Sequence, residues 1–209
     1  MIDQSRSRNG PARVLLEGVR RVSYYPVEGR VEVTPFPSCL RSCLAYMGEN
    51  YGYEYIMGTS GAAFRLLWKP GWHPDNIDIL VMAEDTFEPF RQAFRAVGYA
   101  HEVFGNRGAP DKAELFRRYE SYDYFRSCII ESIRDKRRPV IGFGVIGPPE
   151  CCIITGYDEY GEALIGWNYF QDQKEFNAGV EFEPSGYFRK RNWFKAVSYT
   201  HLRAHETGR

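Results

Sequence analysis

The sequence has no run of apolar residues long enough to cross a membrane. Its longer apolar runs, such as residues 79–83 (ILVMA), are far shorter than the about 20 residues that a transmembrane helix needs. The opening MIDQSRSRNG is polar and has no apolar core of the kind found in secretory signals. Together these absences predict a cytoplasmic protein with no membrane partner.

An excess of charge of either sign is also absent. Lysine and arginine total 27, and aspartate and glutamate total 27. A balanced chain sets up no long-range field toward a polyanion, so we expect no nucleic acid as a partner. The glycine-containing stretch with Gly58 and Gly61 lacks the Gly-Lys-Ser/Thr ending of a phosphate loop, which argues against nucleotide binding through it.

The chain has few thiols and few imidazoles. Its five cysteines are odd in number and lack the paired spacing of a disulfide framework, which favours reduced thiols. Neither Cys39-x3-Cys43 nor the adjacent pair Cys151-Cys152 has the spacing of a zinc site. We therefore expect no metal and no cofactor.

The last thirteen residues, VSYTHLRAHETGR, differ in character from everything before them. They resemble the translated read-through of a transposase adapter used in DNA sequencing libraries. We therefore predict that residues 197–209 are a non-native tail on a domain truncated after Ala196, with a genuine disordered terminus as the alternative. Two of the four histidines lie in this tail, which leaves His73 and His101 as native candidates.

The remaining composition is that of a soluble globular domain. The chain is 44% hydrophobic and 26% charged, and its length of 209 residues suits one core. We expect a disordered N-terminus over residues 1–12 and a single domain over residues 13–196.

Apolar spacing predicts three helical regions. In the first, Pro35 and Pro37 end an extended segment, Ser38 is the N-cap, and the apolar face that follows comprises Leu40, Cys43, Leu44 and Met47. A second helix over 86–97 opens with the capping box Asp85–Glu88. A third helical stretch runs over 113–136, with a break near 121–123.

Strands are predicted from β-branched and aromatic runs between turn residues. They fall within 13–25 and over 76–83, 99–104, 140–146, 151–157, 163–167 and 187–194. Helices come first and a set of closely spaced strands follows, which is the order of an α+β fold with an antiparallel sheet.

Two stretches carry a family resemblance. "RPVIGFGVI" followed by "PPECCIITGYDEYGEALIGWN" is similar to the second half of papain-like cysteine hydrolases of the peptidase family C39. "FPSCLRSCLAYMGENYGYEYIMGTSGAAF" resembles the N-terminal domain of the butirosin-biosynthesis H protein family. The matches touch roughly residues 36–68 and 133–168. The resemblance implies a papain-like fold, with N-terminal helices packed on a C-terminal antiparallel sheet.

The resemblance also implies a site. The family's nucleophilic cysteine stands at the start of the first helix, where Cys39 is the nearest thiol; a second alignment puts that position near Thr34, which has no thiol. The histidine position is occupied by Glu150, and the orienting Asp/Asn position by Asn168. A glutamate with an ordinary pKa of about 4.3 is a poor proton donor near neutral pH.

Each of these residues also has a structural interpretation. Cys39 can be a small buried apolar residue on the same helix face as Cys43, and Glu150 can be a loop residue after two prolines. Trp72, His73 and Trp167 are further candidates to line the cleft, with His73 as an out-of-place base.

Two functions remain open at this point. The first is a degenerate papain-like acyl-transfer domain that binds a small molecule or peptide in the inherited cleft, an acyl-carrier thioester being one candidate. The alternative is an active cysteine-dependent acyltransferase or peptidase-like hydrolase, in which Cys39 attacks, Asn168 orients, and Glu150 or His73 handles protons.

Overall fold

Helices and one extended sheet share the chain, so the expected mixed α+β class is confirmed. The computed structural model describes residues 10–64, 70–71, 85, 87–106, 118–196 and 201–206, with the backbone alone at 106, 195–196 and 201–206. The helices are α2 (Pro35–Tyr46), α3 (Tyr53–Thr59), η1 (Ala62–Phe64), α4 (Glu88–Ala96), α5 (Tyr122–Ile130), η4 (Glu131–Asp135), η5 (Glu159–Gly161) and α6 (Trp193–Ala196). The strands are β1 (Val14–Leu15), β2 (Tyr99–Asn106), β3 (Tyr119–Glu120), β4 (Val140–Phe143), β5 (Cys151–Asp158), β6 (Ala163–Asn168), β7 (Val180–Phe182), β8 (Phe188–Arg191) and β9 (His201–Glu206).

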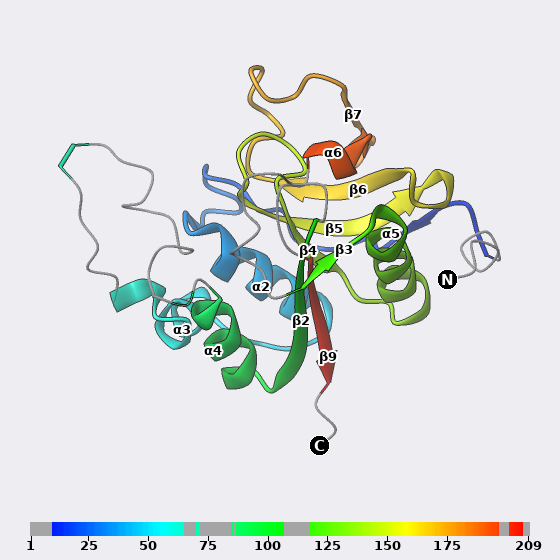
Figure 1. The fold of residues 1–209 in the computed structure, drawn as a ribbon. Coiled ribbons are helices and arrows are strands. Elements are labelled where there is room, and N and C mark those ends of the chain that lie inside the picture. Colours follow the sequence, from blue (N-terminus) through cyan, green and yellow to red (C-terminus); the bar gives the residue numbers. More distant parts are fainter. Residues whose placement is uncertain are drawn as a thin grey trace.

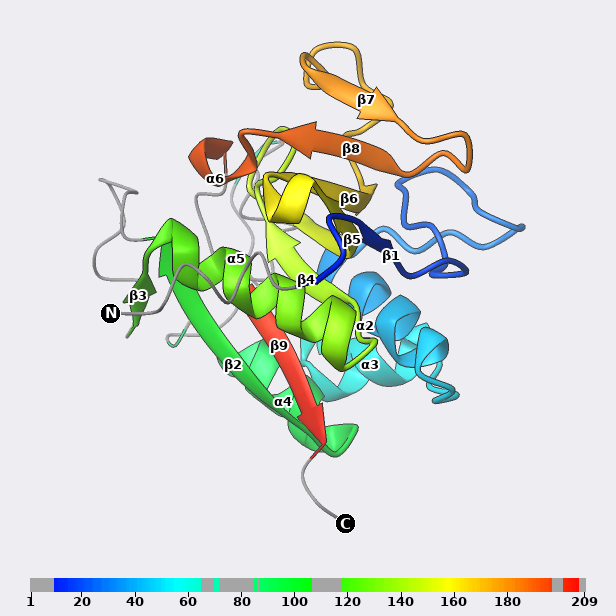
Figure 2. The same ribbon diagram turned by 90° about the vertical axis from the view of Figure 1, so that its right-hand side faces the viewer.

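The sheet runs in the order β3-β2-β9-β4-β5-β6-β8-β7 (Figure 1). Its pairs are antiparallel except for β2 with β3, which run parallel. β4 pairs with the first half of β5, and β1 pairs with the second half, where Leu15 lies opposite Gly156. The helices α2, α3 and α4 lie on one side of the sheet and α5 lies on the other (Figures 1 and 2).

The centre of the sheet is buried on both faces. Every residue of β6 is buried, as is every residue of β5 except its last. Strands covered on both sides read as continuous apolar runs, which is why CCIIT and ALIGW show little alternation with polar residues. A bulge between Ile154 and Gly156 interrupts the β5–β6 register. There the Gly166 backbone lies so close to β5 that an added Cβ would stand 1.9 Å from the Ile153 carbonyl oxygen.

The first helix begins earlier than predicted. Thr34 is its N-cap and Pro35 its first residue, so the expectations that Pro35 and Pro37 end an extended segment and that Ser38 caps the helix were wrong. Proline suits the first turn of a helix because its φ is already helical and its missing N–H would have no partner there. Cys39 therefore lies in the second turn of α2.

Most of the later elements lie where the pattern placed them. α4, β2, β5 and β6 match the predicted helix and strands within two residues at each end. β4 ends at Phe143, earlier than expected, and β8 ends at Arg191, after which α6 begins. Of the region 13–25 only Val14–Leu15 forms a strand. The predicted strand 76–83 lies outside the described residues.

Only the second part of the third predicted helical region is described as a helix. Ser121 accepts a hydrogen bond from the backbone N–H of Tyr124 (3.4 Å) and caps α5, which passes into the π-helical turn η4. The residues just before it form β3 instead of a helix, and those from 113 to 117 lie outside the described ranges.

Both ends of the described chain join the fold more closely than predicted. The carbonyls of Pro11 and Ala12 accept hydrogen bonds from Tyr157 Oη (3.3 Å) and Tyr160 N (2.9 Å), so order begins before residue 13. At the other end, β9, which lies within the stretch 197–209 that we predicted to be a non-native tail, pairs along β2 and at one position with β4. The edges of β2 and β4 have backbone N–H and C=O groups available for pairing, so an extended segment can pair between them whether or not it is native.

Candidate functional site

Helix α2 packs against β5 and brings the two parts of the predicted site together. The Cys39 side chain is 0% exposed, and its thiol lies close enough to the thiol of Cys151, the first residue of β5, to help raise the pKa of that thiol. The helix that carries the candidate nucleophile therefore does face the strand that follows Glu150. The Cys39 sulfur, however, lies beside the Cys151 thiol there.

Two further cysteines lie near Cys39 and Cys151 in this interface. Cys43, one turn after Cys39, and Cys152 are also buried and close enough for their charges to interact with that of Cys39. Burial raises the pKa values of Cys43, Cys151 and Cys152 well above the ordinary thiol value, because a thiolate loses its hydration there. These thiols are therefore protonated at neutral pH, and all five cysteines of the chain are free and buried.

Metal binding needs a different arrangement from this one. Within the described ranges, no three His, Cys, Asp or Glu side chains are arranged so that they could hold a metal ion. Sulfurs crowded in a core without the geometry of a tetrahedral site act as small apolar groups.

Glu150 occupies the turn that leads into β5. Its backbone N–H donates to the Pro148 carbonyl (2.7 Å), and its own carbonyl accepts from Gly144 N (3.2 Å), which closes the loop between β4 and β5. The side chain is half-buried, and its negative charge helps raise the pKa of the adjacent Cys151 thiol. A carboxylate that disfavours the neighbouring thiolate works against nucleophile activation.

Asn168 ends β6 and is 2% exposed. Its Oδ1 accepts from Phe170 N (2.7 Å), and its backbone N–H donates to Gln171 Oε1 (2.9 Å), so it organises the turn after the strand. Its Nδ2 has no partner at regular hydrogen-bond geometry. Asn168 lies opposite Cys152 in the β5–β6 register, and its side chain lowers the pKa of that thiol against the larger effect of burial. The predicted orienting residue is thus the cross-strand neighbour of Cys152.

The position at the start of α2 is held by Thr34. This residue has an extended backbone (φ −92°, ψ 111°), and its side chain makes no capping hydrogen bond. Its N–H donates to Tyr53 Oη (3.0 Å). A hydroxyl therefore stands at the helix N-cap, five residues before the first thiol.

The cleft candidates separate into two groups. Trp167 is 6% exposed, donates from Nε1 to the Val19 carbonyl (2.8 Å) and packs on Tyr187 with ring centroids 4.3 Å apart. It holds the N-terminal segment against β6, which is a structural role. Trp72 and His73 lie outside the described residues.

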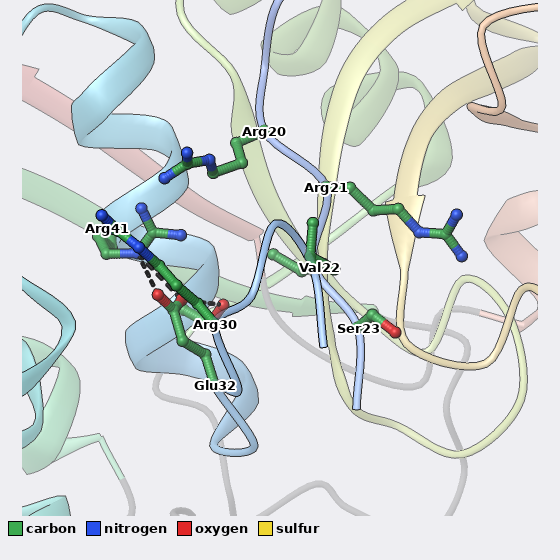
Figure 3. Close-up of a pocket in the computed structure, with 9 residues that line it drawn as sticks. Arg20, Arg21, Val22, Ser23, Arg30, Glu32 and Arg41 are labelled. Carbon is green, nitrogen blue, oxygen red and sulfur yellow. Dashed lines mark hydrogen bonds and ion pairs between the residues drawn. The ribbon is translucent and has the colours of Figure 1, made fainter. Parts of the chain in front are cut away.

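A pocket that the sequence did not suggest opens beside α2 (Figure 3). It is a hollow open to solvent, with about 270 Å³ of empty space when the adjoining solvent is included. Its lining consists of Arg20, Arg21, Val22, Ser23, Val27, Arg30, Glu32, Ser38 and Arg41. Ser38, the residue before Cys39, thus belongs to a pocket wall, while Cys39 itself points into the core.

One buried network shapes the wall of this pocket. Arg41 is 6% exposed, and its Nε lies 2.9 Å from the Glu32 carboxylate. The same carboxylate accepts from Ser38 Oγ at 2.8 Å, and Tyr169 Oη donates to the Glu32 carbonyl at 3.2 Å. The segment before α2 is therefore fixed both to the helix and to the residue that follows Asn168.

Comparison with family models, with curated proteins and with solved structures finds no match. In the described part of the chain, no helix combines the length and the apolar character needed to cross a membrane.

Proposed function

We propose that this chain is a papain-like domain that has lost thiol chemistry and binds a small molecule or peptide in the pocket beside α2. The observation that carries the proposal is the burial of Cys39, which is 0% exposed and lies beside a second buried thiol, that of Cys151. A nucleophile must reach its substrate, and the complete burial of the Cys39 sulfur opposes this.

The other positions support the same conclusion. The N-cap of α2 carries the hydroxyl of Thr34, in line with the alignment that leaves the family's nucleophile position without a thiol. Glu150 stands at the histidine position and disfavours the thiolate of Cys151. Asn168 supports a turn and faces Cys152. The pocket beside Ser38 remains open to solvent and offers a place for a ligand.

The active alternative uses the same helix and strand. In it, Cys39 attacks a carbonyl, with Glu150 handling the proton and Asn168 orienting, on an acyl-carrier thioester or a peptide. One observation favours this function: α2 packs on β5, so Cys39 lies beside the strand that follows Glu150. It requires the Cys39 sulfur to become accessible.

Thiol labelling separates the two functions. The native protein is treated with iodoacetamide between pH 6 and pH 9, digested, and mapped by mass spectrometry, with a sample unfolded in guanidinium as the control. We expect Cys39 to be labelled rapidly only in the unfolded sample, as the other four buried cysteines are. Rapid native labelling of Cys39 that titrates below the free-thiol pKa of about 8.5 would establish the active alternative instead.

A further inference from the structure

The arginine side chains around the pocket are not equivalent. Figure 3 shows Arg20, Arg30 and Arg41 gathered over the first half of α2, whereas Arg21 points away from them. Arg21 pairs with Asp172 and also lies over the Trp167 ring, with its guanidinium carbon 5.6 Å from the ring centroid. Three guanidinium groups therefore share one space, and the fourth belongs to the neighbouring loop.

The side chains of these three arginines can donate further hydrogen bonds. Arg41 is buried and held through Nε by Glu32, and no described residue pairs with its Nη1 or Nη2. Likewise, the Arg30 side chain is exposed and has no hydrogen-bond or ion-pair partner among the described residues. Arg20 pairs with Glu28, which is 62% exposed, and a surface pair of this kind is weak enough to open.

The charges of the lining favour an anion. Four arginines and one carboxylate, Glu32, line the pocket. Glu28 and Asp172 lie outside the lining and offset Arg20 and Arg21, which leaves Arg30 without a counter-ion in the described residues. An oxyanion bound in the pocket would supply this counter-ion.

Geometry distinguishes between kinds of oxyanion. A carboxylate has two oxygens, and one guanidinium fork satisfies both. A phosphoryl group presents three terminal oxygens and therefore suits three converging guanidinium groups.

Backbone amides contribute little to this site. Pro35 and Pro37 have no N–H, and Ser38 N already donates to the Thr34 carbonyl at 3.3 Å. The recognition therefore depends on side chains, in contrast to phosphate loops, where backbone N–H groups hold the phosphate. This difference explains how such a site can exist in a chain without a phosphate-loop motif.

We infer that the pocket formed by Arg20, Arg30 and Arg41 binds the phosphoryl group of a small phosphate ester. The inference extends the proposed binding function, on which it rests, by naming the chemical class of the ligand. Arg41 is the preorganised part of the site because Glu32 fixes its Nε side. Arg20 and Arg30 come from the segment before α2 and close over the bound group.

Calorimetric titration of the full chain at low ionic strength tests the inference. The probes are phenyl phosphate and, as the carboxylate of similar shape, benzoate. We expect phenyl phosphate to bind more tightly than benzoate, and its affinity to fall as salt is added because exposed charges are screened. Failure of phenyl phosphate to bind, or equal affinity for benzoate, would overturn the assignment.

Variants locate the site. Arg30→Gln and Arg20→Gln each remove one charge-assisted contact, so each should raise the Kd for phenyl phosphate about tenfold. Arg137→Gln is the matched control, since Arg137 is also exposed and does not line the pocket. An equal loss in all three variants would mean that binding follows net charge alone and would refute the site.

The two proposals fail in different ways. If phenyl phosphate binds as expected while Cys39 of the native protein is labelled rapidly, the phosphoryl site is established and the loss of thiol chemistry is wrong. If Cys39 is inert and phenyl phosphate does not bind, the loss of chemistry is supported and the ligand class is wrong.

Discussion

The thiols of Cys39 and Cys151 lie beside each other inside the interface between α2 and β5. Both side chains are buried, so the pair joins the first helix to the central strand as part of the core. The residue that resembles a nucleophile is thus a packing residue in this structure.

This relationship predicts a measurable coupling. Cys39→Ala and Cys151→Ala should each lower the free energy of unfolding by about 1–2 kcal/mol, since each removes a buried side-chain atom from the packed interface between α2 and β5. The double variant should depart from additivity by about 0.5 kcal/mol or more in urea unfolding. Cys39→Ala combined with Cys128→Ala is the control, because Cys128 lies in α5 across the sheet, and that pair should be additive.

The close approach of β6 to β5 predicts a severe effect at one glycine. In Gly166→Ala the new methyl group meets the Ile153 carbonyl oxygen, which belongs to backbone and cannot move aside, so the loss of stability should be about 3 kcal/mol or more. Gly58→Ala is a matched control, because no atom lies within 4 Å of a Cβ at that helical position. It should stabilise the protein by about 0.5–1 kcal/mol. Similar unfolding midpoints for the two variants would contradict the described β5–β6 contact.

The buried ion pair of the pocket wall should matter more than a surface pair. Glu32→Gln leaves the Arg41 guanidinium buried without its counter-charge, and we expect a loss of about 3 kcal/mol in denaturant unfolding. Glu28→Gln breaks the exposed pair with Arg20 and should cost less than about 1 kcal/mol. If both changes cost the same, the Glu32–Arg41 pair is not buried as described.

His101 predicts a dependence of stability on pH. Burial, and secondarily the charge of Arg91, lowers the pKa of this imidazole below its ordinary value of 6.5, and its ring stacks on Phe94 with centroids 4.7 Å apart. As the pH falls through 6.5, the unfolded chain takes up a proton before the folded chain does. The free energy of unfolding should therefore decrease from pH 7 toward the lower pKa of the folded state and not decrease further from this cause below it.

A variant isolates this contribution from other titrating groups. His101→Phe keeps an aromatic ring against Phe94 and removes the ionisation. The decrease in urea midpoint between pH 7.5 and pH 5.5 should be smaller in His101→Phe than in the parent protein. Identical decreases in the two proteins would assign the pH dependence to other residues.

The central strands β4, β5 and β6 were predictable from the sequence because they are short, apolar and separated by strong turn residues, whereas β3, β7 and β9 were not predicted. Asp158 illustrates these turn residues, since its Oδ1 accepts from Glu159 N (2.7 Å) and starts the tight connection from β5 to β6. The start of α2 was not predictable, because two prolines in one short stretch also suit an extended segment. Only the folded structure shows that Pro35 is helical.

The pocket could not be predicted for a different reason. Arg20 and Arg30 come from a segment with little regular structure, and no periodicity relates them to Arg41 on α2. The available signal was a group of arginines shortly before a helix in a chain of zero net charge. The role of Cys39 could not be predicted either. The sequence pattern is the same for a buried thiol and for a nucleophile on a helix, and only the surroundings of the sulfur distinguish them.

Strand β9 has a consequence for handling the protein. It is the only described strand that connects β2 and β3 to the rest of the sheet, through β4. Removing residues 201–206 would leave the facing margins of β2 and β4 with unsatisfied amides and carbonyls, and such margins recruit strands from other molecules. A shortened chain should therefore self-associate or precipitate at concentrations at which the full chain stays dispersed.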